Sequence, residues 1–149
     1  MSMTWREAGL RDVHYVLGKL SNVTQGEMRT CGLTSSEVLW KARTHWLHTG
    51  RAYVFLDNAT PVAVFGFNPD RADHEVLTTW LISTQGFHRP KWTLFSRKFL
   101  VKVQKDHPGY RILTTTYSSH PSVPRWFQIL GFEMIGKGDD FRILEYVGT

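Results

Sequence analysis

The sequence has very little cysteine, no long hydrophobic run and no low-complexity segment. Cys31 is the only cysteine among 149 residues, so no disulfide can form within the chain, which fits a reducing compartment. No window approaches the roughly 18 consecutive apolar residues of a membrane helix, and the N-terminus lacks the apolar core of a signal peptide. We therefore expect a soluble protein, without a membrane partner, in the cytoplasm of the cell that makes it or packaged from there.

The bulk composition is that of a globular protein. Hydrophobic residues make up 42% of the chain and aromatic residues 13%, and the length is enough to bury a core. No linker or internal repeat interrupts the chain, so we expect a single domain over residues 1–149. The net charge of +5 favours acidic partners such as nucleic acid, a phosphorylated cofactor or an acidic protein surface, and does not choose among them.

Two helices are predicted in the first third of the chain. One spans residues 11–20, where four apolar residues recur at helical spacing. The other begins after Thr34, which forms a capping box with Glu37, and ends at Gly50. The polar stretch between them, residues 21–32, is expected to be a loop. The apolar residues of the first helix are Val13, Val16, Leu17 and Leu20.

Strands are predicted on both sides of these helices and again near the end of the chain. Their β-branched and aromatic residues are typical of strands, and the turn at residues 57–60 predicts a hairpin. The predicted strands cover residues 4–8, 53–56, 62–67, 75–83, 112–117, 132–135 and 141–147.

The longest predicted helix spans residues 91–105, and a shorter one spans residues 121–130. Alternation of strands and helices in this half favours crossover connections and some parallel pairing. The order β-α-α-β-β-β-α-β-α-β-β predicts an α/β fold around one mixed sheet. The apolar stripe of the long helix is Trp92, Phe95, Phe99 and Val103, widened by Leu94, Leu100 and Val101.

The most specific local pattern is Arg-Trp-Phe-Gln-Ile-Leu-Gly-Phe-Glu at residues 125–133. It resembles the helix of the GNAT acetyltransferases that ends in a Leu-Gly-Phe-Glu step into the next strand. The order of elements resembles the same superfamily over essentially the whole chain. The resemblance implies a GNAT-like fold and an acyl-coenzyme A cofactor.

Within that superfamily the chain is similar to small proteins of short-tailed phages, of the gene-thirteen or internal-virion type. This resemblance implies a phage or host protein as partner, and a location in the host cytoplasm or the virion. It lies in residues 6–8 with Asp12 shortly after, in residues 62–66, 80–84 and 130–132, and in the helix from Trp92.

The resemblance also places a cofactor site after the fourth strand. In active GNAT enzymes a glycine-rich loop there binds the pyrophosphate of coenzyme A through backbone amides and the helix dipole. Here Gly86 is the only glycine of residues 85–93, and Pro90 removes one amide donor, although basic side chains add charge at the helix start. A solvated basic loop is the alternative. The implied acetyl-CoA-binding residues are Ile82, Ser83, Gln85, Gly86, His88, Arg89 and Lys91.

Proton transfer departs from the superfamily pattern. Many GNAT enzymes protonate the leaving thiolate with a Tyr four residues before the Gly of the late helix, and that position is Phe127 here. Tyr117 and His120 lie just upstream as substitutes. Glu75 is the candidate general base by position, since an acceptor ammonium must lose a proton before it attacks. Ordinary exposed roles are the alternative for these residues.

Other features predict less. His45 and His48 share a helix face, but no third ligand is spaced to complete a metal site. Lysines along the helix from Lys91 lack the aromatic platform or motif of a nucleic-acid site. Trp40 lies off the inner stripe of its helix, and an exposed Trp favours a protein partner.

Three functions stay open. The first is an acyl-CoA-dependent N-acyltransferase that acts on an amine of a host protein or small molecule. The second is a GNAT-fold phage protein with a degenerate site that serves virion assembly. The third is a phage protein that binds and redirects a host enzyme. The missing glycines and Phe127 favour the second and third over efficient catalysis.

Overall fold

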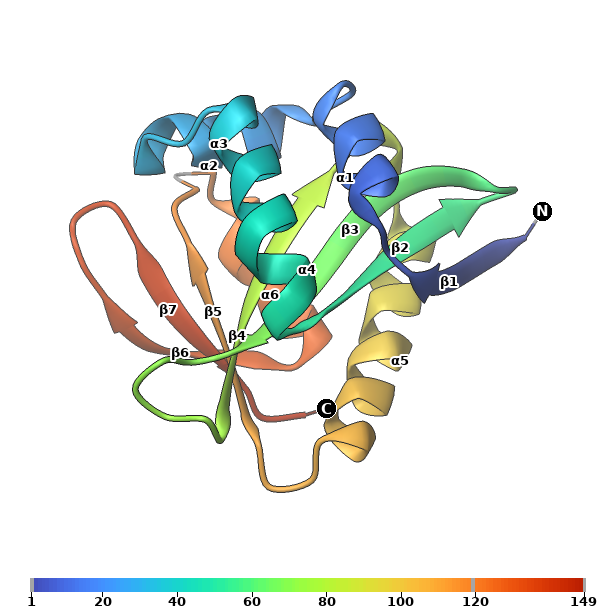
Figure 1. The fold of residues 1–149 in the computed structure, drawn as a ribbon. Coiled ribbons are helices and arrows are strands. Elements are labelled where there is room, and N and C mark those ends of the chain that lie inside the picture. The colour runs from blue at the N-terminus through green and yellow to red at the C-terminus, as the bar shows by residue number, and fades with distance from the viewer. Residues whose placement is uncertain (1, 119, 149) are drawn as a thin grey trace.

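The computed structural model describes residues 2–118 and 120–148, which form one seven-stranded sheet with helices on both faces (Figure 1). The strands are β1 (Met3–Glu7), β2 (Arg51–Asp57), β3 (Thr60–Pro69), β4 (Val76–Ser83), β5 (Arg111–Thr116), β6 (Phe132–Lys137) and β7 (Arg142–Tyr146). The main helices are α1 (Leu10–Leu17), α2 (Asn22–Cys31), α3 (Ser35–Lys41), α5 (Pro90–Asp106) and α6 (Ser122–Leu130). A π-helical turn, η1 (Ala42–Trp46), and α4 (Leu47–Thr49) extend α3, and a short 3-10 turn, η2 (Gln85–Phe87), precedes α5. The mixed α/β fold predicted from the element order is confirmed.

The strands lie in the order β1-β2-β3-β4-β5-β7-β6, and only β4 and β5 are parallel. Their pairing runs from Val76 opposite Arg111 to Thr79 opposite Thr114. Beyond that point β4 continues to Ser83 while remaining paired with β3, and β5 continues to Thr116 while remaining paired with β7. The sheet therefore opens between the carboxyl ends of its two central strands.

Two apolar cores lie on opposite faces of the sheet. Phe55, Phe65 and Trp92 belong to the core beneath α5 and α6. Val16 and Val38 belong to the core beneath α1 and α3, and Figure 1 shows α3 crossing the near face of the sheet while α5 passes behind it. Because both faces are covered, the central strands β2 and β3 are buried over most of their length.

The stripe of α5 is narrower than its sequence predicts. Leu100 is fully buried as expected, but Leu94 is 58% exposed and Val101 is 38% exposed. The sheet covers one side of the helix only, so these two apolar residues face solvent. None of the helices formed by the described residues is long and apolar enough to cross a membrane.

The prediction of a loop over residues 21–32 is wrong, because this stretch forms α2. The Ser21 hydroxyl accepts a hydrogen bond from the Thr24 amide and caps the helix, and Gly32 ends it in the left-handed region at φ 75°. Both end signals stand in the sequence. The polar composition between them conceals the helix from a search for apolar periodicity.

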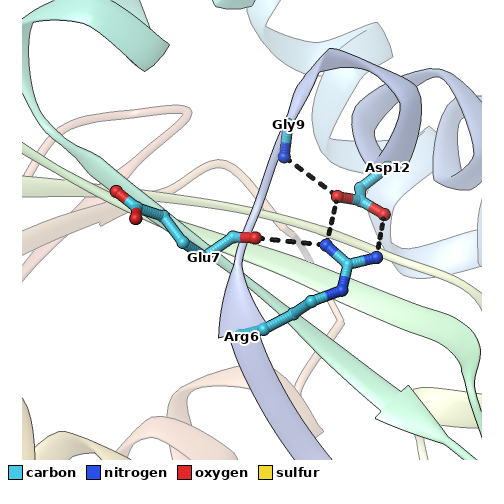
Figure 2. Close-up of polar contacts among 4 residues, drawn as sticks. All are labelled: Arg6, Glu7, Gly9 and Asp12. Carbon is cyan, nitrogen blue, oxygen red and sulfur yellow. Dashed lines mark hydrogen bonds and ion pairs between the residues drawn. The ribbon is translucent and has the colours of Figure 1, made fainter.

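An ion pair joins the end of β1 to the first turn of α1 (Figure 2). The Arg6 guanidinium donates to both carboxylate oxygens of Asp12, at 2.8 and 2.9 Å, and the Gly9 amide donates to the same carboxylate. Burial raises the pKa of Asp12, but the hydrogen bonds from Arg6 and Gly9 outweigh it and hold that pKa below its usual value. Arg6 and Asp12 thus hold the first turn of α1 against the end of β1, and their ion pair has a structural role.

Candidate functional site

A cavity of about 710 Å³ lies where β4 and β5 separate. Its lining includes Val38 and Ile82 from the core under α1 and α3, and Phe87 and Val123 from the core under α5 and α6. Residues of both cores line one cavity, so the cavity passes through the opening in the sheet from one face to the other. A site of this size, in the crevice at the carboxyl ends of strands, is typical of small-molecule binding.

The edge of β4 that faces this opening presents Leu81, not Ile82. The Ser83 amide donates to the Thr24 hydroxyl and the Ser83 carbonyl accepts from the Ser21 amide, so both groups of Ser83 face α2 and away from β3. Backbone groups alternate along a strand, so those of Ile82 face β3 and those of Leu81 face the opening. The backbone groups of Ile82, one of the residues predicted to bind acetyl-CoA, therefore face β3, and the Leu81 amide is the one that faces the opening.

Ser83 is the centre of a polar network at the cavity wall, in which Ser21, Thr24 and Ser83 are buried and His88 is exposed. Its hydroxyl lies 3.0 Å from each of Ser21 Oγ, Thr24 Oγ1 and His88 Nε2. Partial burial of the ring lowers the pKa of His88, which favours the neutral imidazole. The network fixes the end of β4 against α2. It also holds the side chains of Ser83 and His88 next to each other in the cavity lining.

The start of α5 only partly resembles an anion cradle. Pro90 occupies the first turn, where it offers no amide proton, and the N-cap Arg89 makes no capping bond with its side chain. Lys91 Nζ lies 3.1 Å from an Asp57 carboxylate oxygen. Gln85 and Arg89 are exposed beside the helix start, and a Cβ at Gly86 would meet only ordinary contacts. Of the two cationic residues predicted to bind the cofactor, Arg89 is exposed, whereas Lys91 is half-buried and paired with Asp57.

The structure does not bring Glu75 to the cavity. Glu75 precedes β4 at the end where the strand pairs closely with β5, and the Arg111 amide donates to its carbonyl. The opening lies at the other end of β4, so Glu75 does not line it. His120 is exposed, and its Nδ1 lies 2.6 Å from the hydroxyl of Ser122, which does line the cavity. His120 therefore orders the start of α6 from outside the lining.

Glu27 of α2 is the one acidic side chain among the described residues that lines the cavity, and sequence reasoning missed it because the polar composition of residues 21–32 predicts a loop. Its carboxylate accepts hydrogen bonds from the Thr116 hydroxyl and from the amides of Tyr117 and Ser118. Burial raises the pKa of Glu27, and these hydrogen bonds lower it by less, so the carboxyl accepts a proton more readily than an exposed one. The cap at Ser21 is the sequence signal for this helix.

Phe127 and Tyr117 both line the cavity. Phe127 is buried and packs edge-on against the rings of Trp126 and Phe132, so it serves as an apolar wall. Tyr117 follows the end of β5, and its ring centroid lies 6.3 Å from that of Phe141. The side of the cavity nearest α6 is thus largely aromatic.

The remaining features singled out in the sequence lie on the surface. Trp40 is 65% exposed, which confirms its expected outward position. Lys102 forms an ion pair with Asp106 and lies over the ring of Trp5. Across residues 2–118 and 120–148, no three His, Cys, Asp or Glu side chains gather into a group that could hold a metal ion.

Solved structures share this fold closely in shape and only weakly in sequence. An acetyltransferase from Thermus thermophilus has a TM-score of 0.72 at 15% identity, with 97% of this chain and 96% of that chain covered. The chain has the GNAT acetyltransferase fold. A GNAT superfamily phosphinothricin acetyltransferase from Sinorhizobium meliloti in complex with AcCoA has a TM-score of 0.68 at 13% identity, with 97% and 88% covered. AAC(6')-Ib in complex with ribostamycin and coenzyme A has a TM-score of 0.70 at 15% identity, with 97% and 92% covered.

These likenesses confirm the predicted GNAT-like architecture. No model of a known protein family matches the sequence, and a search of curated protein sequences finds no match. Identities of 13–15% establish the shape of the chain and not its reaction. The resemblance to proteins of short-tailed phages stays a prediction.

Proposed function

We propose that this protein is an acyl-CoA-dependent N-acyltransferase. The observation that supports the proposal is the cavity that crosses the sheet between β4 and β5, since it gives two reactants access to one point from opposite faces. Solved structures of the same fold hold coenzyme A or acetyl-CoA, which supports the choice of cofactor. Direct transfer needs a neutral amine and the acyl group to meet in the correct orientation.

Acyl-CoA supplies the acyl group as a thioester, which an amine attacks without further activation. The Leu81 amide faces the opening and would donate a hydrogen bond to the carbonyl oxygen as negative charge develops on it. At the start of α5, Arg89 is positioned to attract phosphates from its exposed site. The residues present therefore fit the acyl end of the cofactor better than its pyrophosphate.

Glu27 would take the proton that the acceptor ammonium must lose. In the balanced step, the neutral amine nitrogen bonds to the acyl carbon and releases its second proton to solvent, the carbon–sulfur bond breaks, and the departing thiolate takes a proton from solvent. A free thiol has a pKa of about 8.5, so this protonation needs no dedicated acid at pH 7. The reaction thus tolerates Phe127 in place of a tyrosine.

The test blocks the opening between the strands. Thr115 of β5 lies beyond the last pair with β4, lines the cavity and is exposed, so Thr115→Trp fills space without disturbing a core. We expect acetyl-CoA to bind the unmodified protein, by calorimetry and by a rise in Tm, and to bind Thr115→Trp at least tenfold more weakly. Thr4→Trp, on the exposed edge strand β1, is the matched control and should bind as the unmodified protein does. Equal binding by both variants would contradict the placement.

A second proposal is a binding role without efficient catalysis, in phage particle assembly or on a host protein. Phe127, which has no proton to give, and the ion pair of Lys91 with Asp57 at the start of α5 favour it. The same titration separates the two proposals. Millimolar acetyl-CoA that changes neither Tm nor heat would support the binding role and contradict the transferase.

A further inference from the structure

The part of the cavity under α2 and α3 has an apolar wall. Met28 comes from α2, Leu33 from the following turn, Val38 from α3, and Trp46 and Trp80 from η1 and β4. These residues also belong to, or pack against, the core beneath α1 and α3. This part of the cavity therefore lies on the face of the sheet opposite α5. The proposed cofactor site begins on the α5 side.

Two tryptophans make this wall aromatic and rigid. The rings of Trp46 and Trp80 stack with centroids 4.7 Å apart and planes 24° apart. The Trp80 indole donates to Asn68 Oδ1 at 2.9 Å, and its ring lies directly over Gly66. The stack and the hydrogen bond hold both indoles in place, so the cavity has a rigid aromatic wall here, which favours an aromatic apolar body over a hydrated polar one.

One carboxylate faces this apolar space. Glu27 lies on α2 one residue before Met28, and its hydrogen bonds to the end of β5 hold it at the opening between the strands. No other acidic side chain among the described residues lines the cavity, and Arg125 lines it with the opposite charge. One ammonium is therefore matched, whereas a second one on the same acceptor would be desolvated without a partner.

We propose that the acceptor is a monoamine on an aromatic apolar body, of the arylalkylamine class, with its ammonium beside Glu27 and its ring toward Trp46 and Trp80. This inference rests on the proposed transferase function and specifies its acceptor. It disfavours polyamines and aminoglycosides, because their additional charges would lie against Met28, Leu33 and Val38.

The experiment compares acceptors with the intact protein and acetyl-CoA. Phenethylamine and spermidine serve as probes, and released thiol and acetylated product are measured at pH 7. We expect phenethylamine to be used at least tenfold more efficiently, in kcat/KM, than spermidine. Glu27→Gln should lower kcat/KM for phenethylamine by about a hundredfold, within the range typical of a lost general base, and should flatten the rise of activity with pH.

Two variants separate a local role from a general one. Met28→Trp narrows the apolar part and should raise KM for phenethylamine while acetyl-CoA binding persists. Glu133→Gln, at an exposed position of β6, is the matched control for Glu27→Gln and should leave kcat/KM unchanged. If Met28→Trp alters neither kcat nor KM, the acceptor does not occupy this part and the inference fails.

The outcomes distinguish this inference from the function on which it rests. Acetyl-CoA that does not bind overturns both. Acetyl-CoA that binds, with spermidine acetylated in preference to phenethylamine, overturns the acceptor class alone. Acetyl-CoA that binds, with neither amine acetylated, also overturns the acceptor class and leaves the cofactor site standing.

Discussion

Replacement of Gly66 in β3, even by alanine, is expected to destabilise the protein. A Cβ built on Gly66 would lie 2.0 Å from the Cε2 and Nε1 atoms of Trp80, a distance that real Cβ contacts essentially never show. The Trp80 ring must therefore move, and it then loses its stack on Trp46 and its hydrogen bond to Asn68.

The stability cost follows from those two losses. An aromatic stack contributes about 1 kcal/mol beyond buried area, and a hydrogen bond of this kind about 1 kcal/mol net. Gly66→Ala should thus lower the free energy of unfolding by about 2 kcal/mol, before any strain in β3. For a chain of this length that corresponds to a fall in Tm of about 4–8 °C.

The assay is thermal and urea denaturation of matched alanine variants. Gly26 lies in α2 with only the end of the Arg29 side chain nearby, so Gly26→Ala should be neutral or stabilising by up to about 1 kcal/mol. In a Trp80→Leu background, the Gly66→Ala substitution should cost much less, because the ring is gone. Equal stabilities of the Gly66→Ala and unmodified proteins would refute the reasoning, as would an unchanged cost in the Trp80→Leu background.

Three further predictions concern charged groups. The pKa of Asp12 is lowered in the folded state, so its ion pair with Arg6 stabilises the protein above the unfolded pKa, and this stabilisation is lost as the pH falls. In urea denaturation, Asp12→Asn should lower the free energy of unfolding by about 1–2 kcal/mol at pH 7 and change it little at pH 3. The pKa of Glu27 is raised in the folded state, so its protonated form stabilises the fold at low pH, and this stabilisation is lost as the pH rises. Glu27→Gln should therefore raise Tm at pH 8 relative to the unmodified protein, and a lower Tm there would contradict a raised pKa of Glu27. Arg89→Ala should weaken acetyl-CoA binding several-fold by calorimetry while Lys91→Ala, which breaks an ion pair with another residue, mainly lowers Tm; unchanged affinity in Arg89→Ala would refute a phosphate site at the start of α5.

The sequence predicts the architecture because local signals agree with the final packing. The capping box at Thr34 forms as expected, with the Glu37 amide donating to its hydroxyl. The long helix over residues 91–105 is observed as α5, extended by one residue at each end. Strong periodicity and turn chemistry determine such elements locally, so one sequence suffices to find them.

The site is harder to predict because it depends on where strands stop pairing. Nothing in the residues of β4 indicates that its pairing with β5 ends at Thr79, and that ending creates the cavity. For the same reason the acidic residue that lines the cavity is Glu27, and not Glu75 as the sequence predicts. Glu75 is near the fourth strand in sequence but at its far end in space, whereas Glu27 reaches the opening from a helix with weak apolar periodicity.

The measurement that most directly tests the central claim is an amide shift map of the protein titrated with acetyl-CoA, by NMR of the backbone N–H groups. An acyl group between β4 and β5 should shift the Leu81 amide strongly, along with those of Thr115 and Tyr117 at the facing end of β5. Amides of the edge strand β1, such as Thr4, should not move. Shifts absent at saturating acetyl-CoA, or confined to residues away from the opening, would contradict an acyl-CoA site in this cavity.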